Sequence, residues 1–165
     1  MTTTEINKIR DSLKAGQRLL GLDIGSKTIG LALSDISILI ATPAKTIWRK
    51  KFTQDVRQIK EIIKVQEVGG LIIGLPISMD GTEGPSCQSV YDFARNITEH
   101  INVPIAFWDE RLSTAAVERV LIKEADMPRK RRSQVVDKMA AAYILQGAID
   151  ATTSSEKMRP DNSNV

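Results

Sequence analysis

Apolar runs and polar breaks in the first fifty residues predict three antiparallel strands. Leu19 to Ile24 and Ile29 to Leu33 are apolar runs separated by a short polar turn that contains glycine, a pattern typical of a β-hairpin. A third run, Ala44 to Trp48, follows a break at Thr42-Pro43 after a short connection. Short connections usually join neighbouring strands, so this run is expected beside the hairpin.

From residue 52 onward the pattern changes to helices that alternate with buried strands. Apolar residues recur at helical spacing over residues 52–67 and again from Pro85 to about His100, which predicts two amphipathic helices. Two short apolar runs, Leu71 to Leu75 and Val103 to Trp108, follow these helices and are typical of strands buried on both faces. Such alternation indicates parallel β-α-β units, so the predicted fold is α/β with a mixed sheet.

The two ends of the chain differ from this central region. Residues 5–14 predict a short amphipathic helix, so residues 1–16 are expected to form an N-terminal helical extension. One domain is expected over residues 17–150, ending in a helix. Residues 151–165 are polar and aperiodic, which predicts a disordered tail.

Length and composition favour one globular domain without a membrane segment. A chain of 165 residues with 42% hydrophobic content can bury a substantial core. No apolar stretch approaches the roughly 20 residues needed to span a bilayer, and the N-terminus lacks an apolar signal core. We therefore expect a cytoplasmic protein with no membrane partner.

Asp23 stands out because it lies inside an otherwise apolar strand. Removing an ionised carboxylate from water costs several kcal/mol unless it is paired, hydrogen-bonded or bound to a cation. Asp23 is therefore expected to face a cleft at a strand end or to have a cation. Neighbouring glycines, Gly21, Gly25 and Gly30, would let a phosphate or a polynucleotide backbone approach. The alternative is that Asp23 only caps the turn.

A second informative carboxylate, Asp137, lies in the last helix. It shares a helix face with Ala140, Ala141 and Ile144, so small residues would bring the acid close to the sheet. Glu110 directly follows the end of another strand. These two acids and Asp23 could therefore converge at the strand ends. The alternative is that Asp137 lies in the first helical turn and only favours the helix dipole, an effect of about 0.3–1 kcal/mol.

The residues available for metal binding indicate oxygen ligands. The chain has one cysteine, Cys87, and one histidine, His100, so neither a disulfide within the chain nor a histidine-rich metal site can form. Carboxylate ligands favour Mg²⁺ or Mn²⁺ over zinc.

Charge permits a nucleic-acid partner without requiring one. The formal net charge is +3 and the pI is about 9.1. A basic run, Pro128 to Arg132, precedes the helix that carries Asp137. Such runs are usually solvated, but a cationic loop at this position could hold the phosphates that flank a reacting one.

Four segments in order resemble a known family. The segments LLGLDIGSKTIGLALSD, GLPISMDGTEG, WDERLST and RKRRSQVVDKMAAAYIL are similar to the bacterial RuvC-like YqgF family, and the resemblance runs from about Leu19 to Ile149. Its members are described as pre-16S ribosomal RNA nucleases or as Holliday junction resolvases. The resemblance implies an RNase H-like fold, a five-stranded mixed sheet flanked by helices, with its first three strands antiparallel.

The resemblance also implies a site and a chemistry. Asp23, Glu110 and Asp137 would be both the catalytic acids and the metal ligands of a magnesium- or manganese-dependent phosphodiester hydrolase. RNase H-like enzymes often use a fourth acid, for which Asp109 and Asp80 are weak candidates. Contacts to the nucleic-acid backbone are assigned to Lys27, Thr28, Arg111, Ser113, Thr114, Lys130, Arg131 and Arg132. Ser113 and Thr114 could instead cap a helix.

The expected substrate is nucleic acid, with precursor ribosomal RNA preferred over branched DNA and ribosomal particles as a further partner. Aromatic residues make up 4% of the chain, which offers no run of rings for base stacking and favours recognition of backbone and shape. Three alternatives stay open. The chain could be a DNA endonuclease similar to Holliday junction resolvases, a non-catalytic RNA-binding factor for ribosome maturation, or, less well supported by its length, half of an actin-like ATPase fold.

Overall fold

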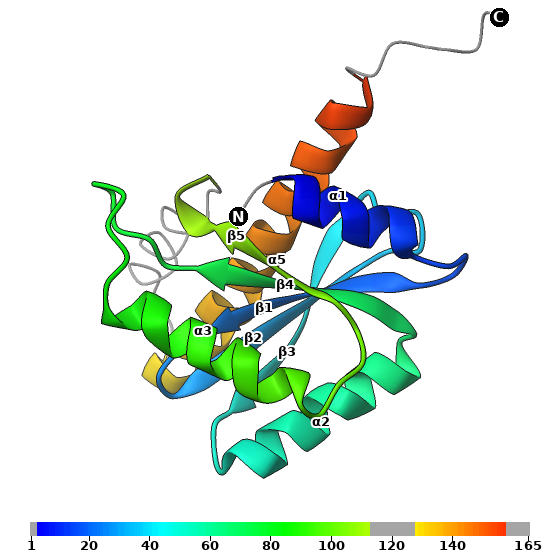
Figure 1. Cartoon of the computed structure of the whole chain (residues 1–165). Helices are drawn as coiled ribbons and strands as arrows, with labels where there is room; N and C mark the ends of the chain where they lie inside the picture. Colours follow the sequence, from blue (N-terminus) through cyan, green and yellow to red (C-terminus); the bar gives the residue numbers. More distant parts are fainter. Residues whose placement is uncertain (1–2, 113–127, 158–165) are drawn as a thin grey trace, which may run out of the picture.

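A computed structural model describes residues 3–112 and 128–157 and contains a five-stranded sheet between two helical layers (Figure 1). The elements in chain order are α1 (Thr3–Ser12), β1 (Arg18–Ile24), β2 (Thr28–Ser34), β3 (Ala41–Trp48), α2 (Phe52–Val65), β4 (Val68–Leu75), α3 (Pro85–Thr98), β5 (Ile105–Asp109), the short 3-10 helix η1 (Glu110–Leu112) and α5 (Arg129–Lys157).

The sheet is mixed, as the sequence predicts. Its strand order is β3-β2-β1-β4-β5. β1 pairs antiparallel with β2, and β2 pairs antiparallel with β3. β4 lies parallel to β1, and β5 lies parallel to β4. The carboxyl ends of β1, β4 and β5 therefore meet at one end of the sheet.

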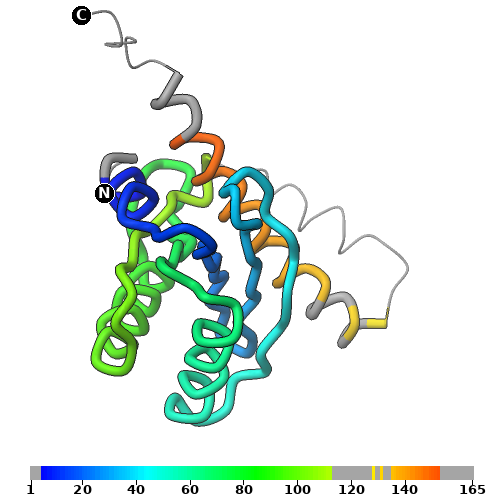
Figure 2. Tube along the Cα trace, turned by 90° about the vertical axis from the view of Figure 1, so that its right-hand side faces the viewer, coloured from blue at the N-terminus to red at the C-terminus, as the bar shows by residue number. Residues whose placement is uncertain are grey.

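Each face of the sheet has its own apolar core. α2 and α3 cover one face, where their buried side chains pack against alternate residues of the strands, such as Leu20, Leu22 and Ile73. α1 and α5 cover the other face, where they pack against Leu19 of β1 and Ile72 of β4. Figure 2 shows α5 on the opposite side of the strands from α3. Because both faces are buried, the central strands are apolar throughout, which explains their continuous apolar runs.

The N-terminal helix is present but is not a separate extension. Ile6 and Ile9 are buried in the core beneath α5. The Arg10 guanidinium donates a 2.7 Å hydrogen bond to the hydroxyl of Thr152 in α5. Residues 1–16 were expected to lie outside the domain, whereas α1 completes the second core.

Two element boundaries differ from the predictions around glycine and proline. The sequence predicts a strand from Leu71, whereas β4 begins at Val68 and includes Gly69 and Gly70, and the chain turns just before it, at Glu67 with a φ of 52°. Close packing explains the glycine, since a Cβ on Gly70 would collide with Ile9 of α1. β3 begins at Ala41 and contains Pro43, next to a register shift between Leu31 and Ala32 of β2. An edge strand tolerates a proline there.

α5 is longer than predicted at both ends. It begins at Arg129, so the basic run is helical and is not the cationic loop expected from the sequence. It continues to Lys157, so the expected tail begins too early at residue 151. Residues 113–127, with the helix expected there, and residues 158–165 lie outside the described part.

Within residues 3–112 and 128–157, every helix is too short or too polar to cross a bilayer.

Candidate active site

Asp23 lies near the end of β1 and faces α5. It is 6% exposed and is the cross-strand partner of Gly30 on β2. A Cβ on Gly30 would collide with the backbone carbonyl of Asp137 in α5. Because cross-strand partners project to the same face of a sheet, the Asp23 side chain also points toward α5. The close contact at Gly30 thus brings the backbone of α5 next to this carboxylate.

Glu110 reaches the same face from the edge of the sheet that β5 forms. It is the first residue of η1, directly after β5, and is 8% exposed. Its Oε1 atom lies 2.9 Å from the position that a Cβ on Gly74 would occupy, a position that also adjoins Ile144 of α5. Gly74 therefore leaves the space that the Glu110 carboxylate uses.

Asp137 is held by the hairpin. Its side chain is half-buried, and its Oδ2 atom accepts a hydrogen bond from the hydroxyl of Thr28, the first residue of β2. α5 begins at Arg129, so Asp137 lies beyond the first two turns. The alternative that it serves the helix dipole is wrong, because that effect fades within the first turn.

The three acids therefore share one end and one face of the sheet. Asp23 follows Leu22 on β1 and Gly74 follows Ile73 on β4, and Leu22 and Ile73 are partners, so Asp23 and Gly74 lie toward the same end of the sheet. The described ranges nevertheless hold no group of three acids, cysteines or histidines already gathered at metal-ligand distances. The donor set fits Mg²⁺ or Mn²⁺ in its chemistry, since all three side chains offer hard oxygen ligands.

Asp109 and Asp80, the candidates for a fourth acid, are engaged elsewhere. Ala106 and Trp108 of β5 pack in the core beneath α5, so Asp109, one residue along, projects to the other face. Its carboxylate forms a 2.7 Å ion pair with Arg111, whose hydrogen bonds lower the pKa of Asp109. Asp80 is exposed, and it accepts hydrogen bonds of 2.6 and 3.0 Å from the hydroxyl and amide of Thr82. Hydrogen bonds to Thr82 lower the Asp80 pKa.

The residues assigned to the nucleic-acid backbone divide into three groups. Lys27 and Arg131 are exposed, as a phosphate contact requires, whereas the guanidinium of Arg111 is held by Asp109. Thr28 is 6% exposed, and its hydroxyl donates a hydrogen bond to Asp137. The remaining four residues or their side chains lie outside the described part: Ser113, Thr114, Lys130 and Arg132.

Arg49 is a cation that the sequence reasoning missed. Its amide donates a 2.8 Å hydrogen bond to the Lys27 carbonyl, and its guanidinium donates one of 2.7 Å to the Gly25 carbonyl. The same guanidinium lies 5.6 Å from the ring centroid of Phe93. Arg49 thus supports the hairpin turn that follows Asp23. The available signal was the basic run Arg49 to Lys51, directly after the third strand.

Comparison with known sequences indicates the family of this chain. The profile of the RuvX family, described as "Holliday junction resolvase", matches residues 17–151. Relatives named "Putative pre-16S rRNA nuclease" include one from Paramagnetospirillum magneticum, 64% identical over 84% of this chain and 89% of the relative. Another, from Rhodospirillum rubrum, is 48% identical over 99% of both chains.

Solved structures show the same fold at much lower identity. The yeast mitochondrial Holliday junction resolvase Ydc2 is 13% identical, with a TM-score of 0.51 over 93% of this chain and 87% of that one. RuvC of T. thermophilus in complex with a Holliday junction substrate is 14% identical, with a TM-score of 0.50 over 84% of this chain and 97% of that one. The RNase H-like fold expected from the sequence is confirmed, and the chain belongs to the RuvX (YqgF) family.

Proposed function

We propose that this chain is a metal-dependent nuclease whose catalytic acids are Asp23, Glu110 and Asp137. The observation that carries the proposal is the contact of α5 with Gly30, which places Asp137 on the same face as Asp23. Glu110, seated at Gly74, completes the set. The names of the family and of its relatives support nuclease activity.

The chemistry expected at this site is hydrolysis of a phosphodiester bond. The three carboxylates would hold Mg²⁺ or Mn²⁺, and a bound divalent ion supplies Lewis-acid stabilisation of the phosphoryl oxygens and lowers the pKa of water. The chain itself then has to orient these ligands and attract the polyanion. Thr28 orients Asp137 through its hydrogen bond, while Lys27 and Arg49 place positive charge at the turn after Asp23.

The proposed substrate is precursor 16S ribosomal RNA, cleaved during maturation of its 5′ end. The support is the shared name of relatives that are 48–64% identical to this chain. A four-way DNA junction is the second candidate, because the family description names a Holliday junction resolvase.

The test uses three variants that keep the shape of each acid but remove its charge: Asp23→Asn, Glu110→Gln and Asp137→Asn. Each should abolish Mg²⁺-dependent cleavage while the fold remains intact. Asp92→Asn is a matched control, since Asp92 is an exposed acid on α3 whose carboxylate accepts hydrogen bonds from Gln88 and Arg95 of the same helix. It should cleave like the wild type.

Each protein is incubated with a precursor 16S 5′ region and with a four-way DNA junction, at equal magnesium and salt. Cleavage of the junction with the RNA intact would reverse the substrate preference. If the wild type binds RNA but cleaves neither substrate with Mg²⁺ or Mn²⁺, the chain is a binding factor and the nuclease proposal fails. Unchanged activity in all three acid variants would equally reject the catalytic assignment.

A further inference from the structure

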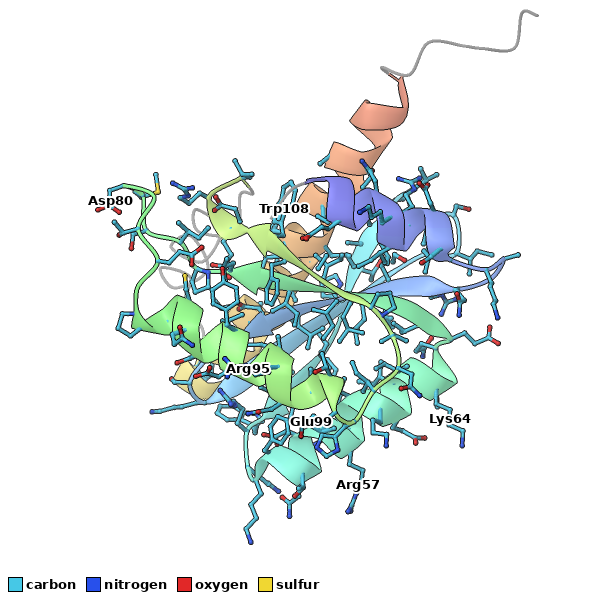
Figure 3. All side chains as sticks on the ribbon, viewed as in Figure 1. Arg57, Lys64, Asp80, Arg95, Glu99 and Trp108 are labelled. Carbon is cyan, nitrogen blue, oxygen red and sulfur yellow. The ribbon has the colours of Figure 1, made fainter. Side chains whose placement is uncertain are left out.

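A basic groove lies along α2, on the helical layer opposite α5. It has a volume of about 490 Å³ and is lined by α2 and by His100, which follows α3. Arg57, Lys60 and Lys64 supply its positive charge. Figure 3 shows Arg57 and Lys64 projecting from α2 away from the sheet. We call this feature the α2 groove.

The charge of the α2 groove is not neutralised by the part of the chain that the structure describes. Arg57, Lys60 and Lys64 recur at intervals of three and four residues, so they lie on one helix face. Glu61 is the one acid among the lining residues, yet no ion pair joins it to these cations within residues 3–112 and 128–157. Like charges at this spacing repel one another, so an anion bound in the groove would relieve the repulsion.

Asp55, the acid in the first turn of α2, does not neutralise the groove either. It is 1% exposed, and its carboxylate accepts a 3.0 Å hydrogen bond from the amide of Lys50. It therefore stabilises the start of the helix from inside the fold and leaves the groove positive.

The positive charge continues from the α2 groove toward the candidate active site. α2 begins directly after Lys50 and Lys51, which are exposed. Arg49 before them is hydrogen-bonded to the hairpin turn that follows Asp23. At 1.5 Å per residue, the helix places Lys64 roughly 20 Å from Lys51. This distance suits a strand of nucleic acid better than a single small anion.

We propose that the α2 groove binds the sugar-phosphate backbone of the nucleic-acid substrate, outside the segment that is cleaved. The proposal rests on the proposed nuclease function and assigns it a second contact region. Recognition by lysine and arginine is directed at phosphate. RNA and DNA share this chemistry, and the experiment distinguishes them.

The experiment measures binding without cleavage. Asp23→Asn protein, which should not cut its substrate, is titrated with a stem-loop RNA that carries single-stranded tails, and with a DNA of the same sequence, over a range of salt concentrations. The double substitution Lys60→Gln/Lys64→Gln is then introduced into the Asp23→Asn protein, and the titration is repeated. Each phosphate contact on a single strand contributes about 0.7 to the slope of log K against log salt, so losing two should flatten the slope by about 1.4.

The matched control is Lys8→Gln/Lys14→Gln. It removes the same charge from exposed lysines in and after α1, on the opposite helical layer. Its salt slope should stay close to that of the parent protein. If both double variants weaken binding equally, only net charge matters and the groove assignment is rejected.

Shortening the RNA tails separates the remaining outcomes. Loss of the difference between the two double variants on a tail-less stem-loop would show that the groove holds a flanking strand. If the two double variants differ in their affinity for inorganic phosphate but bind every nucleic acid alike, the groove is a small-anion site and the proposal is overturned. No nucleic-acid binding by any of these proteins would instead contradict the proposed function itself.

Discussion

The Thr28 hydroxyl donates a hydrogen bond that helps to orient the Asp137 carboxylate. Thr28 is buried at the start of β2 and donates to Oδ2 of Asp137. A hydrogen bond of this kind orients a ligand before the ion binds, and such supporting contacts are commonly worth about 10–100-fold in metal affinity or activity. Thr28 therefore acts as a positioning residue within the proposed nuclease.

Replacing Thr28 with valine should reduce cleavage by about 10–100-fold and raise the magnesium concentration needed for half-maximal activity. Valine keeps the shape of threonine but removes the donor. Thr28→Ser keeps the donor, so its half-maximal activity should need a magnesium concentration close to that of the wild type. The measurement is cleavage rate against magnesium concentration for both variants, together with their melting temperatures. Equal magnesium dependence in the valine variant and the wild type would show that the hydrogen bond is only structural.

Some residues of the candidate site could be predicted from the sequence, and others could not. Asp23 could be singled out because a carboxylate in an apolar strand breaks a local pattern, and Asp137 because its helix face is otherwise small and apolar. The role of Thr28 could not be predicted in this way, since its partner is 109 residues away. Its position in a turn instead suggested a surface contact.

Among the elements, the contact between α5 and β2 governs the candidate site. At Gly30 the helix backbone lies so close that a side chain has no room. This approach is what turns a strand acid and a helix acid toward each other.

Gly30→Ala should therefore displace α5 and destabilise the protein by about 3 kcal/mol, the upper end for overpacking, because backbone cannot move aside as a side chain can. Cleavage should also fall. Gly84→Ala is the control, since a Cβ there meets nothing within 4 Å and only a weaker helix-capping effect is expected. Urea unfolding of both variants tests this. A stable, active Gly30→Ala protein would mean that α5 can shift without disturbing the acids.

The β2–β3 turn gives a prediction of pH dependence. The Asp35 carboxylate accepts hydrogen bonds of 2.8 and 3.1 Å from the amides of Leu39 and Ile40, and these bonds lower its pKa from the ordinary 3.8. A carboxyl group with a lowered pKa stabilises the folded state above its unfolded pKa, and that contribution disappears as the pH falls through the folded value.

Asp35→Ala should thus be less stable than the wild type near neutral pH, and the difference should shrink as the pH falls below about 4. Urea unfolding of both proteins at a series of pH values measures this. A difference that stays constant across the series would assign the effect to the shape of the turn and not to the charge of Asp35.

Element type was easier to predict than element boundaries. The apolar periods of α2 and β4 correctly gave a helix followed by a buried strand. The start of the strand was placed too late, at Leu71 and not at Val68, because glycines such as Gly69 and Gly70 are uncommon inside strands. In the structure Gly70 makes room for α1, which is a tertiary requirement with no local signal.

At the scale of the whole molecule, the mixed sheet was predictable because short turns join its antiparallel strands, whereas helices precede its parallel strands in the sequence. The division of the apolar residues between two cores was not. Continuous apolar strands show that both faces are covered without showing which helix covers which face. The role of α1 follows from this second core, since it packs beneath the C-terminal half of α5 although it lies at the other end of the chain (Figure 1).

The second core therefore predicts that α1 is required for the stability of the whole domain. Ile9→Ala should lower the free energy of unfolding by about 2–4 kcal/mol, because Ile9 is 5% exposed and fills the space beside Gly70. Ile36→Ala removes the same atoms from a side chain that is 59% exposed and should change stability by no more than about 0.5 kcal/mol. Urea unfolding followed by two probes, the fluorescence of Trp48 and Trp108 and far-ultraviolet circular dichroism, should give one coincident transition in Ile9→Ala. Separate transitions, or a cost no larger than that of Ile36→Ala, would show that α1 is an appendage that folds independently of the sheet.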